Sequence, residues 1–117
     1  MTTELNELQR KWLEALRSGN YTQCYSVLRG AVGGYCCLGV LCDVYDSAGW
    51  VGTLWRVDED GQETIHGLEP PRFLAEEVGL DNGDVGACVD LNDAVHAPFT
   101  TIADKLEAYW LEGTPLK

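Results

Sequence analysis

The sequence has few basic residues, and this shortage excludes one class of function. Only 8 lysines and arginines stand against 19 aspartates and glutamates in 117 residues, which gives a formal net charge of −11. A protein that binds DNA or RNA of any sequence needs a basic face that neutralises phosphates. Because so few basic residues do not supply such a face, we do not expect general nucleic-acid binding.

The sequence also lacks a long hydrophobic run and a leader segment. Its longest nearly apolar stretch, residues 35–42, is far shorter than the roughly 20 residues of a membrane-spanning helix. The N-terminal residues MTTELNELQRKW are amphipathic and contain no apolar segment typical of a signal peptide. We therefore expect a protein of the cytoplasm that has no membrane partner.

Motifs for metals, nucleotides and common hydrolases are absent as well. The chain has no HExxH, GxSxG or dinucleotide-binding pattern, and GAVGG at 30–34 lacks the lysine of a phosphate-binding loop. Five cysteines without an export signal do not predict a disulfide framework. On one helix Cys36, Cys37 and Cys42 would point in different directions, unlike zinc ligands. We expect no metal and no cofactor, and interpret the thiols as small core residues.

The hydrophobic pattern that is present predicts one compact α+β domain over residues 1–117. Hydrophobic residues make up 45% of the chain, and no repeat or low-complexity linker divides it. Helical spacing of apolar residues runs through 5–16, 37–45, 73–78 and 99–110. TLWRV and QETIHG flank an Asp-Gly turn at 60–61, which predicts a β-hairpin. The expected fold is a small antiparallel sheet packed by four to five helices.

Four further features of the sequence need separate interpretation. Residues 21–28 form either a short strand or an irregular connection. The composition of DNGD at 81–84 predicts a loop, and residues 86–95 form a short helix or an extended piece. Gly39 lies inside the predicted 37–45 helix. There it either costs about 1 kcal/mol relative to alanine or lets another backbone or a ligand approach closely.

The acidic residues are distributed unevenly. Residues 1–57 hold five acids and five bases, whereas residues 58–117 hold fourteen acids and three bases and carry the whole net charge. One interpretation is a solvated surface that keeps a small protein in solution. Another is an acidic decoy, a face that imitates nucleic acid or binds a basic host protein. The residues of that candidate face are Asp58, Glu59, Asp60, Glu76, Glu77, Asp81 and Asp84.

The neutral half contains residue types that suit an anionic ligand. Arginines offer forked donors to phosphate, and aromatic rings offer stacking faces to a base. The candidate ligand-binding residues are Arg17, Tyr21, Gln23, Arg29 and Tyr35, which we expect in a pocket between the first helix and the 37–45 helix. If these groups bond only to the protein's own backbone, they are structural capping and turn residues instead.

A cysteine-dependent hydrolase is a third hypothesis. Cys36 or Cys37 follows two glycines at the start of a helix, whose N-terminus stabilises a thiolate. The hairpin then supplies His66, and Asp90 or Asn92 could orient it, in the order cysteine before histidine found in papain-like folds. No further signature of such an enzyme accompanies these residues, so the two binding hypotheses rank above it.

Two groups of motifs stand out along the chain. The first comprises Trp12, ALRSG at 15–19, Tyr21, Gln23, Leu28 and YCCLGVLCDVY at 35–45, and the second comprises LND at 91–93 followed by Phe99 and IAD at 102–104. Together they resemble the pattern of a family of small proteins encoded by bacteriophages and prophages, with CCLGVLC as the most specific part. The resemblance extends from about residue 12 to residue 107.

This resemblance implies a phage accessory protein that acts inside the infected cell. Small non-catalytic phage proteins commonly counter host defence by covering a partner's surface or by sequestering a signalling nucleotide. Our leading expectation is therefore an anti-defence binding module that takes up a small anionic molecule. A host protein bound through the acidic half is the alternative partner, and self-association into a homo-oligomer stays open.

Overall fold

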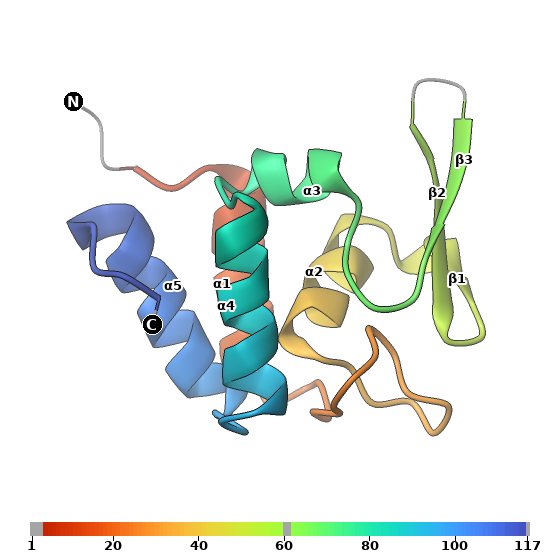
Figure 1. Ribbon diagram of the computed structural model, residues 1–117, viewed down its shortest axis with the longest axis horizontal. Helices are drawn as coiled ribbons and strands as arrows, with labels where there is room; N and C mark the ends of the chain where they lie inside the picture. Colours follow the sequence, from red (N-terminus) through yellow and green to blue (C-terminus); the bar gives the residue numbers. More distant parts are fainter. Residues whose placement is uncertain (1–3, 60–61, 117) are drawn as a thin grey trace.

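The computed structural model describes residues 4–59 and 62–116, and within them it shows an α+β fold (Figure 1). The helices are α1 (Glu7–Arg17), α2 (Cys37–Tyr45), α3 (Arg72–Glu77), α4 (Asn82–Asp93) and α5 (Phe99–Glu112), with a short 3-10 turn, η1 (Ser47–Gly49). The predicted fold class is confirmed. No helix in the described ranges is long and apolar enough to cross a membrane.

The sheet is a three-stranded antiparallel one in the order β1 (Trp50–Val51), β2 (Leu54–Glu59), β3 (Gln62–His66). The β2–β3 hairpin is confirmed, with Trp55 opposite His66. Its predicted Asp60-Gly61 turn lies outside the described residues. The hairpin projects from the end of the molecule farthest from α5, so much of it lies away from the helical core (Figure 1).

Helix α1 follows the predicted amphipathic pattern. Asn6 caps it: its side chain accepts the Gln9 N–H at 2.7 Å, and the Gln9 side chain accepts the Asn6 N–H at 2.8 Å. Trp12, Leu13 and Leu16 are buried against α2 and α5. The Trp12 indole also donates to the carbonyl of Cys37 at 2.9 Å, which gives a fully buried ring a polar partner.

Helix α2 is the centre of the core, as its largely apolar sequence predicts. Every residue from Cys37 to Cys42 is buried. A methyl group built on Gly39 would lie 1.8 Å from the carbonyl oxygen of Leu28, far inside van der Waals contact. Of the two predicted reasons for Gly39, the close approach of another backbone segment is therefore confirmed.

The prediction of a loop at DNGD is wrong, because α4 begins at Asn82. Asp81 caps the helix by accepting the Asp84 N–H at 2.8 Å, and the Asp84 carboxylate accepts the Asp81 N–H at 3.0 Å. Asparagine, aspartate and glycine favour turns, but aspartate is also among the best N-caps. The helix continues to Asp93, so the segment at 86–95 is mostly helical rather than extended.

The connection between α1 and α2 is irregular, which was one of the two predicted states of residues 21–28. It forms only isolated bridges, from Tyr35 to Gln23 and from Tyr35 to Arg29. Leu28 is its one fully buried side chain. Most of the predicted ligand-binding residues lie on this connection, so its path decides which of them meet.

Candidate functional site

Three of the five predicted ligand-binding residues come together on one surface. Tyr21, Arg29 and Tyr35 all lie on the connection between α1 and α2, and the structure adds Trp50 from β1 and Asp43 from α2. We call Tyr21, Tyr35 and Trp50 the aromatic cluster. The other two predicted residues, Arg17 and Gln23, make contacts elsewhere.

The rings of the aromatic cluster meet edge to face. The centroids of Tyr21 and Tyr35 are 5.2 Å apart with an interplanar angle of 83°, and those of Tyr35 and Trp50 are 5.7 Å apart at 66°. These geometries are favourable for aromatic pairs because the positive edge of one ring faces the negative face of the next. Each ring is half-buried, so the cluster has both a packed side and a side open to solvent.

Asp43 holds two of these rings in place. Its carboxylate accepts the Tyr21 hydroxyl at 2.6 Å and the Trp50 indole N–H at 2.9 Å. Burial, followed by this hydrogen bond and the nearby negative charge, raises the pKa of Tyr21 well above its ordinary value. Tyr21 therefore stays a neutral donor, and the two rings keep their mutual orientation.

Arg29 lies over two rings of the aromatic cluster, Tyr35 and Trp50. Its guanidinium carbon is 5.7 Å from the centroid of Tyr35 and 5.4 Å from that of Trp50, both within cation–π range. One guanidinium nitrogen donates a long hydrogen bond, 3.4 Å, to the carbonyl of Gly52. In the part of the chain that the structure describes, no carboxylate lies within ion-pair distance of Arg29.

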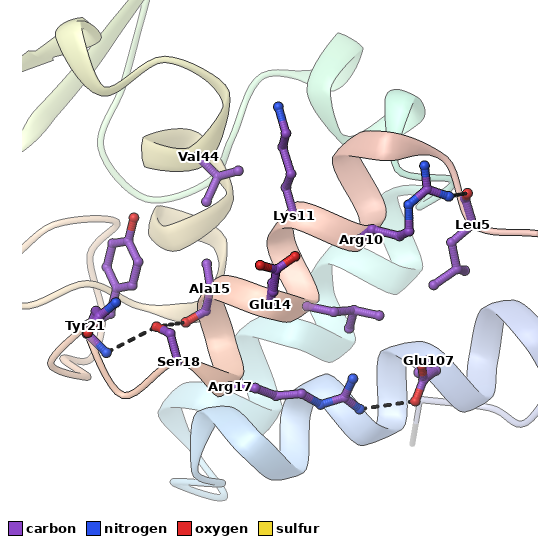
Figure 2. Close-up of a pocket in the computed structure, with 12 residues that line it drawn as sticks. Leu5, Arg10, Lys11, Glu14, Ala15, Arg17, Ser18, Tyr21, Val44 and Glu107 are labelled. Atoms are coloured by element: carbon purple, nitrogen blue, oxygen red, sulfur yellow. Dashed lines mark hydrogen bonds and ion pairs between the residues drawn. The ribbon is translucent and has the colours of Figure 1, made fainter.

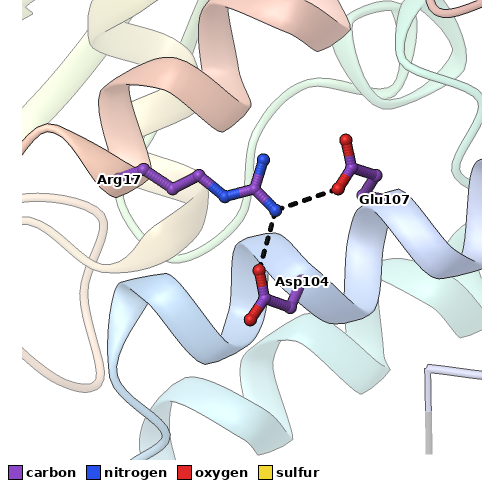
Figure 3. A network of polar contacts seen from close by, with 3 residues as sticks. All are labelled: Arg17, Asp104 and Glu107. Atoms are coloured by element: carbon purple, nitrogen blue, oxygen red, sulfur yellow. Dashed lines mark hydrogen bonds and ion pairs between the residues drawn. The ribbon is translucent and has the colours of Figure 1, made fainter.

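Arg17 contrasts with Arg29, because it is bound to two acids of α5. One of its nitrogens donates to Asp104 at 2.8 Å and to Glu107 at 3.1 Å (Figure 3). The hydrogen bond to Asp104 is the main reason why the pKa of Arg17 is raised further above its ordinary value. An anionic ligand would have to displace these carboxylates, so Arg17 is better explained as a link between α1 and α5.

A groove along α1, which we call the α1 groove, has a volume of about 870 Å³ (Figure 2). Arg10, Lys11 and Arg17 contribute its basic groups, and Tyr21 lies at the end near Val44. All three basic side chains have partners in the protein, since Arg10 donates to the Leu5 carbonyl and Lys11 pairs with Glu7 at 3.1 Å. Tyr21 is thus shared by the α1 groove and the aromatic cluster, whereas Gln23 lines neither.

Gln23 instead belongs to a hydrogen-bond network around Asn92. The Gln23 amide donates to the Asn92 side chain at 2.9 Å and to the Ala97 carbonyl at 2.8 Å. Asn92 also accepts the Cys37 N–H and donates to the Cys24 carbonyl. With 1% of its surface exposed, Asn92 ties the irregular connection to α4, and Gln23 is structural.

The cysteines lie in surroundings that disfavour a thiolate. Cys36 is the N-cap of α2, where its sulfur accepts the Gly39 N–H at 3.3 Å, but burial raises its pKa to about 12. The contact with Cys88 and then burial raise the pKa of Cys37 as well. His66 ends β3 and lines a groove that includes neither cysteine. These observations give no support to the third hypothesis, a cysteine-dependent hydrolase.

The residues of the predicted acidic face have several different roles. Glu76 pairs with Arg72 at 3.0 Å, and Asp81 and Asp84 cap α4, while Glu77 is exposed. Asp58 and Glu59 belong to β2, and Asp60 lies outside the described residues. Over the described ranges no three His, Cys, Asp or Glu side chains are grouped to hold a metal ion.

Sequence reasoning missed Trp50 and Asp43. Asp43 did carry a signal, because it is the one charged residue in an otherwise apolar helix, and a charge that is half-buried there needs a partner. Trp50 had none, because its place beside Tyr35 depends on how β1 packs against the irregular connection.

Comparison with known proteins places the chain in a family. No curated protein and no solved structure matches it significantly. The family model described as a domain of unknown function, DUF8296, matches residues 4–70, which include α1, α2, the sheet and the whole aromatic cluster. The chain therefore belongs to the DUF8296 family.

Proposed function

We propose that the protein is a non-catalytic binding module for a small anionic ligand that carries a planar ring, such as a nucleotide. The observation that carries this proposal is the state of Arg29. It lies on two aromatic rings and has no acidic partner among the described residues, whereas Arg17, Arg56 and Arg72 each pair with a carboxylate. An anion at Arg29 would displace no internal ion pair.

The contact with the rings suits Arg29 to this role. A guanidinium presents its donors in its own plane, so contact with an aromatic face orients it and leaves donors available. A phosphate or carboxylate group accepts such donors as a fork. The solvent side of Tyr35 and Trp50 then offers a surface for the ring of the same ligand.

The fixed orientation of the rings favours binding. Because Asp43 already holds Tyr21 and Trp50, little side-chain freedom is lost when a ligand arrives. The charges named at the site are the Arg29 guanidinium and the Asp43 carboxylate, which is already bonded to Tyr21 and Trp50, and residues 1–57 are neutral in sum although the whole chain carries −11. The net charge of the protein therefore does not argue against an anionic ligand at this place.

The test is a thermal-shift titration with a panel of linear and cyclic nucleotides. A ligand at a hundred times its Kd stabilises the folded state by about 2.7 kcal/mol, and the shift grows with concentration. Arg29→Gln should abolish the shift. Arg72→Gln is the matched control, because it removes the same charge from an exposed helical pair on α3. A flat response across the panel, or equal shifts in both variants, would refute the proposal.

The biological setting is also part of this proposal. The motifs that resemble phage and prophage proteins support a role in the infected cell, where the module would sequester a nucleotide signal of host defence. Expression of the protein in a defended bacterium should then restore plaque formation by a sensitive phage. The Arg29→Gln variant should not restore it, and rescue by both proteins would rule out this use of the site.

A further inference from the structure

Strand β3 is an edge strand whose outer side is open. It pairs with β2 on one side, and in the described ranges no strand or isolated bridge pairs with its other side. Just after the strand, the Gly67 carbonyl accepts the Leu28 N–H at 2.8 Å, so the connection before α2 covers only that end. The unpaired N–H and C=O groups of an edge strand can pair with another extended chain.

A groove of about 570 Å³ adjoins this edge, and we call it the β3 groove. Its lining combines apolar side chains, including Ile65, Leu68 and Val89, with the acids Glu69 and Asp93, and it includes no lysine or arginine. Ile65 is 55% exposed and Leu68 67% exposed. Apolar groups this exposed beside an open edge are typical of a surface that a partner covers.

The charge of the groove indicates the kind of partner. One carboxylate oxygen of Asp93 accepts the Ser26 N–H at 3.0 Å and the Asn92 amide at 2.8 Å, which holds this half-buried acid in place. Glu69 is exposed, and the half of the chain that contains both acids carries the whole net charge of −11. A positively charged segment would be attracted at long range and would find acids beside the edge.

We propose that the β3 edge and the β3 groove bind an extended basic segment of a partner protein, which adds to the sheet as a fourth strand. Main-chain hydrogen bonds to β3 supply affinity, and alternate side chains of the segment contact the groove. Its apolar side chains cover Ile65 and Leu68, and a lysine or arginine reaches Glu69 and Asp93. This surface shares no residue with the aromatic cluster or Arg29, so either proposal can fail alone.

The probe is a fluorescent peptide of about ten residues that alternates lysine and valine, a length that covers one strand. Its anisotropy should rise on titration with the full chain, and its affinity should fall steeply with salt. A peptide with glutamate in place of lysine should not bind. A peptide interrupted by proline should not bind either, because proline has no N–H to donate to the neighbouring strand. Binding of the proline-containing peptide at equal affinity would overturn strand addition.

Two charge-reversal variants separate a local site from general attraction. Glu69→Lys should weaken the lysine–valine peptide by about fivefold or more, because it places a positive charge at the groove. Glu112→Lys makes the same change in net charge at the end of α5, on the opposite side of the molecule (Figure 1). Equal weakening by both variants would show that the peptide responds only to net charge, and would overturn the proposal.

Hydrogen exchange locates the peptide. Bound peptide should slow exchange of amides in β3, at Glu63 and Ile65, while those of α4 are unchanged. Protection of the same amides without peptide, together with a dimer in sedimentation, would overturn the proposal in favour of pairing between two copies of the chain.

Discussion

Replacement of Gly39 by alanine tests how tightly the irregular connection packs on α2. The added methyl group would lie 1.8 Å from the Leu28 carbonyl oxygen and 2.7 Å from its carbonyl carbon, so the helix and the connection must separate. That carbonyl also accepts the Cys36 N–H at 3.1 Å. Separation therefore weakens a buried hydrogen bond as well as the packing of the core.

The expected change in the free energy of unfolding combines two destabilising effects and one stabilising effect. Overpacking of a core costs about 1–3 kcal/mol, and loss of the hydrogen bond costs about 1 kcal/mol. The higher helix propensity of alanine returns about 1 kcal/mol. We expect Gly39→Ala to lower the free energy of unfolding by about 2 kcal/mol, which for a chain of this size lowers Tm by roughly 6–10 °C.

Gly86→Ala is the matched control. Gly86 also lies inside a helix, α4, but a methyl group built on it meets nothing within 4 Å. This variant should gain about 0.5–1 kcal/mol from helix propensity alone. Urea unfolding followed by circular dichroism measures both changes. Equal effects of the two substitutions, in either direction, would refute the close packing of Leu28 against α2.

Two further predictions concern the buried polar groups and thiols. Asn92→Ala removes a hydrogen-bond partner of the Cys37 N–H, the Cys24 carbonyl and the Gln23 amide. It should lower the free energy of unfolding, measured in urea, by about 2–4 kcal/mol. A loss below about 1 kcal/mol would contradict the role of Asn92 as the link between the irregular connection and α4. Because the folded-state pKa of Cys36 is raised to about 12, the folded thiol stays protonated when the unfolded one ionises. The contribution of Cys36 to the free energy of unfolding is therefore complete below about pH 9 and falls as the pH rises toward 12. A midpoint of urea unfolding that stays constant between pH 8 and 10 would contradict this prediction.

The predictions that succeeded depend on local sequence. The spacing of apolar residues located α1, α2 and α5, and the turn residues located the β2–β3 hairpin, because neighbouring residues determine these periodicities. The loop predicted at 81–84 failed for a local reason too. Aspartate favours turns and helix starts alike. The composition of DNGD does not reveal that the next residue, Val85, is buried as part of α4.

The sequence predicted only part of the candidate site. Arg29 and Arg17 are chemically alike and both lie in the neutral half of the chain. Arg17 is bound by Asp104 and Glu107, which are 87 and 90 positions away, and no pattern near Arg17 reveals them. Gln23 likewise meets Asn92 across 69 positions.

The sequence by itself thus determined the low basic content, the helices α1, α2 and α5, and the β2–β3 hairpin. Composition and short-range periodicity are enough to predict these features. Only the tertiary structure decided that Arg17 pairs with two acids whereas Arg29 contacts two aromatic rings. The physical reason is that a charged side chain is satisfied by whatever group the fold brings within a few ångströms of it. For Arg29, the fold brings two aromatic rings there.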